Sequence, residues 1–149
     1  MKRVWLVKLV LFGCLIACRE PRGVLLPSTS EQLALSMQPN IIAGDAQLPS
    51  VRISAGRGSV TMVMTRRWVC GGQVLAGVNR APRDLAIVVR QVSPDSLLVC
   101  TLMIAVLDYT GTITGLPAGS YRVRVFEAQS NNRSRVLGSA TVSVSSPAT

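Results

Sequence analysis

The sequence predicts an all-β fold, an antiparallel sandwich of about seven strands behind an N-terminal signal helix and a linker. From residue 48 onward, short runs rich in β-branched residues alternate with turns of glycine, proline, serine and aspartate. The last two runs, 120–127 and 139–145, place apolar side chains at every second position. With 149 residues, 48% of them hydrophobic, the chain has enough apolar residues for one domain with a packed core.

Turn signals separate the expected strands. A glycine turn at 55–58 follows the first, and the paired glycines Gly71 and Gly72 indicate a bend or bulge. The run 97–107 is almost wholly apolar, which fits a buried helix, but its β-branched content favours a central strand buried on both faces. A small barrel is the main alternative architecture. The expected strands are 51–54, 59–65, 85–91, 97–107, 112–114, 120–127 and 139–145.

A basic start and a short apolar run at the front of the chain are typical of an export signal. Lys2, Arg3 and Lys8 accompany an apolar stretch at 9–17 that ends in a small residue. This stretch is shorter than the ~20 residues that a bilayer-spanning helix needs. We therefore expect residues 1–17 to be a signal peptide and not a transmembrane anchor.

The stretch ends in Leu15-Ile16-Ala17-Cys18, which resembles the bacterial lipobox. The resemblance implies cleavage before Cys18 and lipidation of its thiol, so that the membrane is a partner, since two or three acyl chains hold firmly. The residue after Cys18 is Arg19, and not the aspartate that retains many lipoproteins at the inner membrane. This favours a location in the outer membrane, where the organism has one. An ordinary signal peptide is the alternative, and a lipobox ending at Cys14 is poorer because Phe12 lies near the cut.

Two cysteines remain after this processing, Cys70 and Cys100. Exported proteins fold in an oxidising compartment, so we expect these two to form a disulfide that stabilises the fold by ~3–4 kcal/mol. Two free buried thiols are the alternative. Two cysteines without any histidine make half a zinc shell, so we expect no metal site.

Residues 18–47 read as a tether ahead of a sandwich domain at 48–146. Ser28 and Glu31 have capping-box spacing before an apolar triplet, which predicts one short helix at about 29–37, ended by Pro39. A linker without regular structure is the alternative.

Every positively charged side chain of the processed chain is an arginine. Loss of Lys2, Arg3 and Lys8 lowers the basic residues from 16 to 13 against 7 acidic ones, and the net charge from +9 to +6. The arginines are scattered and few aromatics accompany them, so we expect no nucleic-acid partner. Solvated surface charge is the default interpretation, and an anionic envelope partner is the alternative.

The residue types that remain argue against an enzyme. Without histidine or lysine, the processed chain has no Ser-His or Ser-Lys nucleophile and no Schiff base. The carboxylates lie mostly in expected loops or strand ends, where aspartate is common for turn reasons. We therefore expect no catalytic residue and no cofactor.

A second resemblance lies at 112–125, which includes Leu116-Pro117-Ala118-Gly119-Ser120-Tyr121. This stretch is similar to the penultimate-strand region of fibronectin type III and other immunoglobulin-like domains. It is equally similar to a segment of carboxypeptidase-regulatory-like sandwiches. It implies an immunoglobulin-like sandwich in which the Tyr121 hydroxyl bonds to the backbone of the preceding corner and Leu116 fills the core. Antibody-type domains place a cysteine two residues after this tyrosine, where Val123 stands here. The expected disulfide is therefore a different one.

Together these features imply a membrane-tethered extracytoplasmic lipoprotein that is a binding, adhesion or scaffold module for an envelope protein or glycan. The alternative is a carrier of a small lipid or apolar ligand, or an envelope-maintenance factor. An enclosed apolar cavity between the sheets favours the carrier. A filled core with a long unpaired edge strand favours the binding module.

Overall fold

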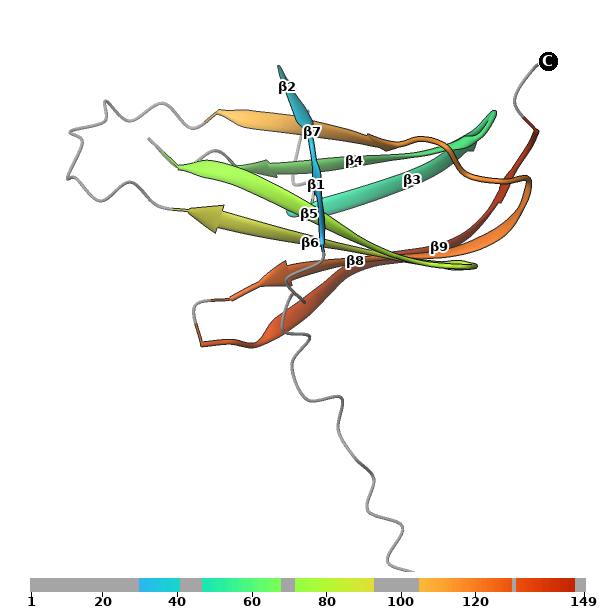
Figure 1. Ribbon diagram of the computed structural model, residues 1–149. Helices are drawn as coiled ribbons and strands as arrows, with labels where there is room; N and C mark the ends of the chain where they lie inside the picture. Colours follow the sequence, from blue (N-terminus) through green and yellow to red (C-terminus); the bar gives the residue numbers. More distant parts are fainter. Residues whose placement is uncertain (1–29, 41–46, 68–71, 93–104, 130, 147–149) are drawn as a thin grey trace, which may run out of the picture.

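The computed structural model describes residues 30–40, 47–67, 72–92, 105–129 and 131–146. These residues form an all-β fold of two packed sheets, which confirms the predicted class (Figure 1). A five-stranded sheet has the order β1-β5-β6-β8-β9, and a four-stranded sheet has the order β2-β7-β4-β3. The strands are β1 (Glu31–Leu33), β2 (Leu35–Pro39), β3 (Ser50–Gly56), β4 (Ser59–Arg67), β5 (Gln73–Ala81), β6 (Asp84–Val92), β7 (Val106–Ile113), β8 (Gly119–Ala128) and β9 (Ser134–Val144).

The short helix expected at 29–37 is wrong, because β1 and β2 occupy this segment. β1 pairs with β5 and β2 pairs with β7, so the chain changes sheet at Ala34. Glu31, expected to cap a helix, instead holds Arg80 of β5, with its Oε2 2.8 Å from the arginine Nε. Leu33 is buried in the core. The sandwich therefore begins at β1, within the segment assigned to the tether, because tertiary pairing outweighs the local capping signal.

Three more strands differ from the expectation. β9 begins at Ser134, five residues before the expected strand 139–145. β5 occupies a segment with no predicted strand, since Gly77 and Asn79 dilute its apolar pattern. β7 begins at Val106, where the expected strand 97–107 is about to end, and residues 97–104 lie outside the described ranges. A Cβ on Gly111 would lie 2.8 Å from a methyl carbon of Leu33, so the glycine lets the β1–β2 segment pack against β7.

The sandwich is not purely antiparallel. β6 and β8 pair in parallel, whereas every other strand pair among the described residues is antiparallel. Between β6 and β8 the chain crosses to the other sheet as β7 and then returns, so β8 runs in the direction of β6 (Figure 1).

Side chains from both sheets fill the space between them. The four-stranded sheet contributes Val60, Met62, Met64 and Tyr109 to one buried cluster, and the five-stranded sheet contributes apolar residues at alternate positions. The latter include Val78, Leu85, Ile87, Val89, Tyr121, Val123 and Val125.

The corner before β8 has the contacts that the resemblance implies. The Tyr121 hydroxyl donates a hydrogen bond to the carbonyl oxygen of Pro117 at 2.9 Å, and Leu116 is buried in the core. Arg83 lies against this corner, with its guanidinium carbon 5.2 Å from the centroid of the Tyr121 ring and its Nη1 3.1 Å from the carbonyl oxygen of Ala118. Gly119 has a φ of +145°, and a Cβ there would lie 2.1 Å from the Arg83 guanidinium.

Gly119→Ala therefore combines backbone strain with displacement of Arg83, and we expect it to lower the free energy of unfolding by about 2–3 kcal/mol. Gly115 also has a positive φ (+72°), but a Cβ there meets nothing within 4 Å, so Gly115→Ala serves as the strain-only control. We expect it to cost about 1 kcal/mol. Urea denaturation measures both. In an Arg83→Ala background the cost of Gly119→Ala should fall toward that of the control, and an unchanged cost would refute the displacement of Arg83.

Candidate functional site

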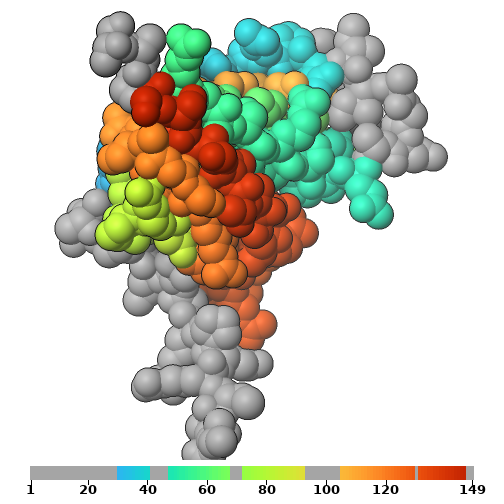
Figure 2. Space-filling view, turned by 90° about the vertical axis from the view of Figure 1, so that its right-hand side faces the viewer, coloured from blue at the N-terminus to red at the C-terminus, as the bar shows by residue number. Residues whose placement is uncertain are grey.

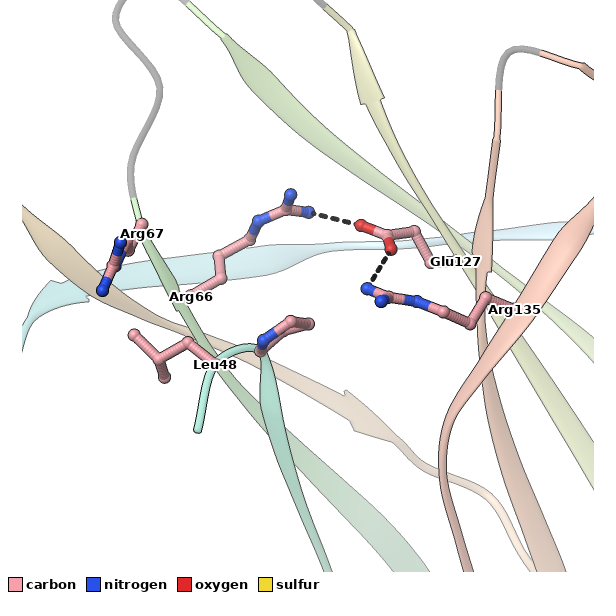
Figure 3. A pocket seen from close by; sticks show the side chains of 6 residues that line it. Leu48, Arg66, Arg67, Glu127 and Arg135 are labelled. Carbon is pink, nitrogen blue, oxygen red and sulfur yellow. Dashed lines mark hydrogen bonds and ion pairs between the residues drawn. The ribbon is translucent and has the colours of Figure 1, made fainter. Parts of the chain in front are cut away.

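A cleft of about 360 Å³ lies at the end of the sandwich where β4 and β8 finish and β3 and β9 begin (Figure 3). Three strands supply its charged residues: Arg66 and Arg67 end β4, Glu127 lies near the end of β8, and Arg135 near the start of β9. The segment leading into β3 supplies an apolar wall. The lining residues are Leu48, Pro49, Arg66, Arg67, Glu127 and Arg135.

The Glu127 carboxylate lies between two guanidinium groups. Its Oε1 is 3.3 Å from Nη1 of Arg66, and its Oε2 accepts a hydrogen bond from Nη2 of Arg135 at 2.8 Å. Arg66 also donates to the side-chain carbonyl of Gln91 on β6. Because Arg66 belongs to the four-stranded sheet and its partners to the five-stranded sheet, these contacts join the two layers.

Strand geometry explains why these charges converge. Along β8 the inward side chains are Tyr121, Val123 and Val125, and the next inward position is Glu127. A bulge between β8 and β9 falls at Val125, and beyond it Glu127 lies opposite Arg135. The last inward side chain of β8 is therefore the carboxylate of Glu127, which lies where the core borders solvent.

The cleft carries more positive than negative charge. Three arginines line it against the single carboxylate of Glu127. The side chains of Arg66 and Glu127 are only 14% and 15% exposed, whereas that of Arg135 is 53% exposed. Nη1 of Arg66 is buried and has no hydrogen-bond acceptor among the described residues, since its contact with Glu127 is an ion pair without hydrogen-bond geometry. Arg67 forms no ion pair with a residue that the structure describes.

A second cleft of about 400 Å³ adjoins the first and shares Leu48, Pro49 and Arg135 with it. Its other lining residues include Val136 and Leu137 of β9. Val136 is 58% exposed and provides an apolar side chain at the rim. The two clefts together form what we call the basic cleft: a charged recess with an apolar rim.

β9 borders this cleft and is an edge strand. It pairs with β8 on one side, and on its other side no strand of the described chain is hydrogen-bonded to it. β3 approaches it at Gly138, where a Cβ would lie 3.1 Å from that of Val51. Ser145, just after β9, accepts a hydrogen bond at 2.9 Å from the backbone N–H of Gly58 in the β3–β4 turn. Figure 2 shows β9 in red at the surface beside the turquoise β3.

A second polar cluster surrounds Asp108 on β7. Thr65 donates a hydrogen bond to its Oδ1, and the side-chain amide of Asn40 lies 2.9 Å from both carboxylate oxygens. Arg52 lies 4.0 Å away. The hydrogen bonds from Thr65 and then Asn40, with the charge of Arg52, lower the pKa of Asp108 against the opposing effect of burial. Since these contacts join β3, β4 and the residue that follows β2 to β7, we assign this cluster a structural role.

Of the predicted site residues, the structure describes only the two at the corner. Leu116 and Tyr121 lie together at the corner, at the end of the sandwich opposite the basic cleft. Cys18, Cys70 and Cys100 lie outside the described residues. The cleft was not predicted, because its members are scattered along the chain, although the inward alternation of β8 identifies Glu127 as a charged residue at a core-facing position.

No family model matches this chain. Comparison with the curated proteins and with the solved structures gives no match either. The ranges that the structure describes contain no helix long and apolar enough to span a membrane. They also bring together no group of three or more histidine, cysteine, aspartate or glutamate residues that would hold a metal ion.

The lowered pKa of Asp108 predicts an acid-sensitive contribution to stability. Folding lowers this pKa below its ordinary value of 3.8, so the ionised carboxylate stabilises the fold above that pH. The contribution is lost as the pH falls through the lower pKa of the folded state. We expect Asp108→Asn to be less stable than wild type at pH 7, and the difference to shrink below about pH 4. Denaturation curves from pH 7 to pH 2 measure it, and a constant difference over that range would contradict the assignment.

Proposed function

We propose that this chain is a non-enzymatic binding module of a bacterial cell envelope, tethered to a membrane through a lipid on Cys18. The basic cleft and the neighbouring edge of β9 are its contact surface for an envelope partner. The alternative, a carrier of a small apolar ligand, requires a cavity between the sheets.

The observation that carries the choice between these two functions is the filled interior. The large core residues Tyr109, Tyr121, Met62 and Met64 are fully buried and occupy the space between the sheets from both sides. The basic cleft, by contrast, opens at the end of the sandwich, and Arg66, Arg67, Glu127 and Arg135 supply its charged lining. This arrangement favours recognition at the surface over enclosure of an apolar molecule.

The lipid anchor rests on the sequence Leu15-Ile16-Ala17-Cys18, and it limits where a partner lies. From Cys18 to Glu31 at the start of β1 is a short stretch of chain, which spans at most about 45 Å when fully extended. A tethered sandwich therefore meets partners close to the membrane that holds it.

We further propose that the sandwich is of the immunoglobulin-like type and that Cys70 and Cys100 form a disulfide. The hydrogen bond from Tyr121 to the corner at Pro117 supports the first. For the second, Cys70 lies in the β4–β5 connection and Cys100 in the β6–β7 connection. The flanking residues are neighbours in register, since Arg67 pairs with Val106 and Gln73 with Val92. Both connections therefore leave from the same end of the sandwich.

Metabolic labelling with palmitate tests the anchor. We expect the wild-type chain, expressed in a lipoprotein-processing bacterium, to incorporate label and the Cys18→Ser variant to incorporate none, because the thiol is the acceptor for the first lipid. Immunoprecipitation followed by autoradiography measures the label.

Cys14→Ser is the matched control, because it removes a thiol from the same leader four residues earlier. It should be labelled as strongly as wild type. Equal labelling of Cys18→Ser and wild type, or loss of label only in Cys14→Ser, would contradict lipidation at Cys18.

A further inference from the structure

We propose that the basic cleft binds an extended acidic segment of a partner protein, which adds as a strand to the edge of β9 at residues 134–137 and places its carboxylates on Arg67 and Arg135. This inference rests on the proposed function and names the chemistry of the partner. The acidic-strand site is independent of the lipobox and of the corner at Tyr121.

The charge of the cleft calls for an anionic ligand. Glu127 pairs with Arg66 and Arg135, and the described residues offer Arg67 no counter-ion. Arg135 uses its Nη2 on Glu127, and with half of its side chain exposed it keeps other donors of its planar fork available. Two guanidiniums that remain accessible beside one internal carboxylate fit two further carboxylates of a ligand.

The edge of β9 supplies the backbone partner. Beyond the approach of β3 at Gly138, the segment 134–137 borders the cleft, and no described strand pairs with its outer edge. An unpaired edge offers a row of N–H and C=O groups to an added strand, whose backbone hydrogen bonds are independent of its sequence. The arginines then supply the specificity.

The alternation of β9 predicts the pattern of the ligand. Arg135 lies opposite Glu127 and faces the interior side of the sheet, and the next residue, Val136, faces outward and lies opposite Phe126. A strand added to this edge has the same two faces. Acidic side chains at every second position therefore meet the arginines, and apolar side chains between them meet Val136.

The same geometry favours a peptide over a lipid headgroup. An anionic headgroup would satisfy Arg67 and Arg135, but it has no backbone to pair with the edge at 134–137. It also leaves the exposed Val136 without a matched apolar side chain.

Titration of residues 19–149, which include all nine described strands, with two matched peptides tests the inference. The probe is acetyl-Val-Glu-Val-Glu-Val-amide, and its control is the same peptide with glutamine in place of glutamate. We expect the acidic peptide to bind at least about tenfold more tightly, since each charge-assisted hydrogen bond outweighs a neutral one. We also expect amide chemical shifts to change along 134–137.

N-methylation of the acidic peptide tests the strand pairing. Two peptides are made, one methylated on the odd-numbered residues and one on the even-numbered residues. Only one of them should lose binding, because the N–H groups of alternate residues point to the same edge and only one edge of the added strand faces β9.

Three arginine variants locate the site. Arg135→Gln and Arg67→Gln should each weaken binding of the acidic peptide about fivefold or more. Arg133→Gln removes the same charge from the same hairpin outside the cleft, and should change binding less than about twofold. Circular dichroism checks that each variant folds, and Arg67, exposed at the end of β4, keeps the test valid if Arg135→Gln does not fold.

The outcomes separate this inference from the lipid anchor. Equal binding of both peptides, no binding up to millimolar concentration, or equal losses in Arg133→Gln and Arg135→Gln would overturn the acidic-strand site, whatever the palmitate label shows. Phosphatidylglycerol vesicles that bind residues 19–149 through Arg67 and Arg135 while the peptide does not would overturn it in favour of a lipid ligand. Peptide binding without palmitate labelling would leave the site intact and refute the anchor.

Discussion

The ion pairs of Glu127 join the two sheets at the end of the sandwich that carries the basic cleft. One carboxylate holds Arg66 of the four-stranded sheet and Arg135 of the five-stranded sheet, in a place where two of the three side chains are mostly buried. Burial of a charge is costly unless it is paired, so each member of the cluster depends on the others. The same pairing fixes the direction of the guanidiniums, and a preorganised donor set loses less entropy when it binds a ligand.

The two ends of the molecule are built differently. At one end the corner of Tyr121, the Leu116 side chain and the hydrogen bonds among Gly58, Leu116 and Ser145 hold the sandwich together, and Arg83 lies against the Tyr121 ring. At the other end the sheets meet through charged side chains around an open cleft. Core packing accounts for the stability of the fold, and we propose the charged end as the recognition surface.

The sequence predicted the strands whose apolar pattern is strong and failed where tertiary contacts decide. β3, β4, β6, β8 and the part of β9 from Ser139 onward follow alternation or glycine turns that are visible in the sequence, whereas the first five residues of β9 were not predicted as strand. β1 and β2 were mistaken for a helix because Glu31 has the spacing of a capping residue, and only the fold reveals that its partner is Arg80. The parallel pairing of β6 and β8 depends on the path of β7 through the other sheet, which no local pattern encodes.

Less of the candidate site than of the fold could be predicted from the sequence. Arg66 and Glu127 meet only because β4 and β8 end at the same end of the two sheets, and a single sequence does not give that register. The inward position of Glu127 could be read from the alternation of β8, but its partners could not. The corner residues Leu116 and Tyr121 were accessible because they lie close together in the chain and belong to a recurrent motif.

A double-mutant cycle on Arg66 and Glu127 tests most directly whether this pair joins the two sheets. Arg66→Gln, Glu127→Gln and the double variant are compared with wild type by the free energy of unfolding at low salt. We expect a coupling energy of about 1–3 kcal/mol, since Glu127→Gln leaves Arg66 without its carboxylate and Arg66→Gln leaves Glu127 with Arg135 alone. Additive effects of the two substitutions would mean that the pair does not hold the sheets together.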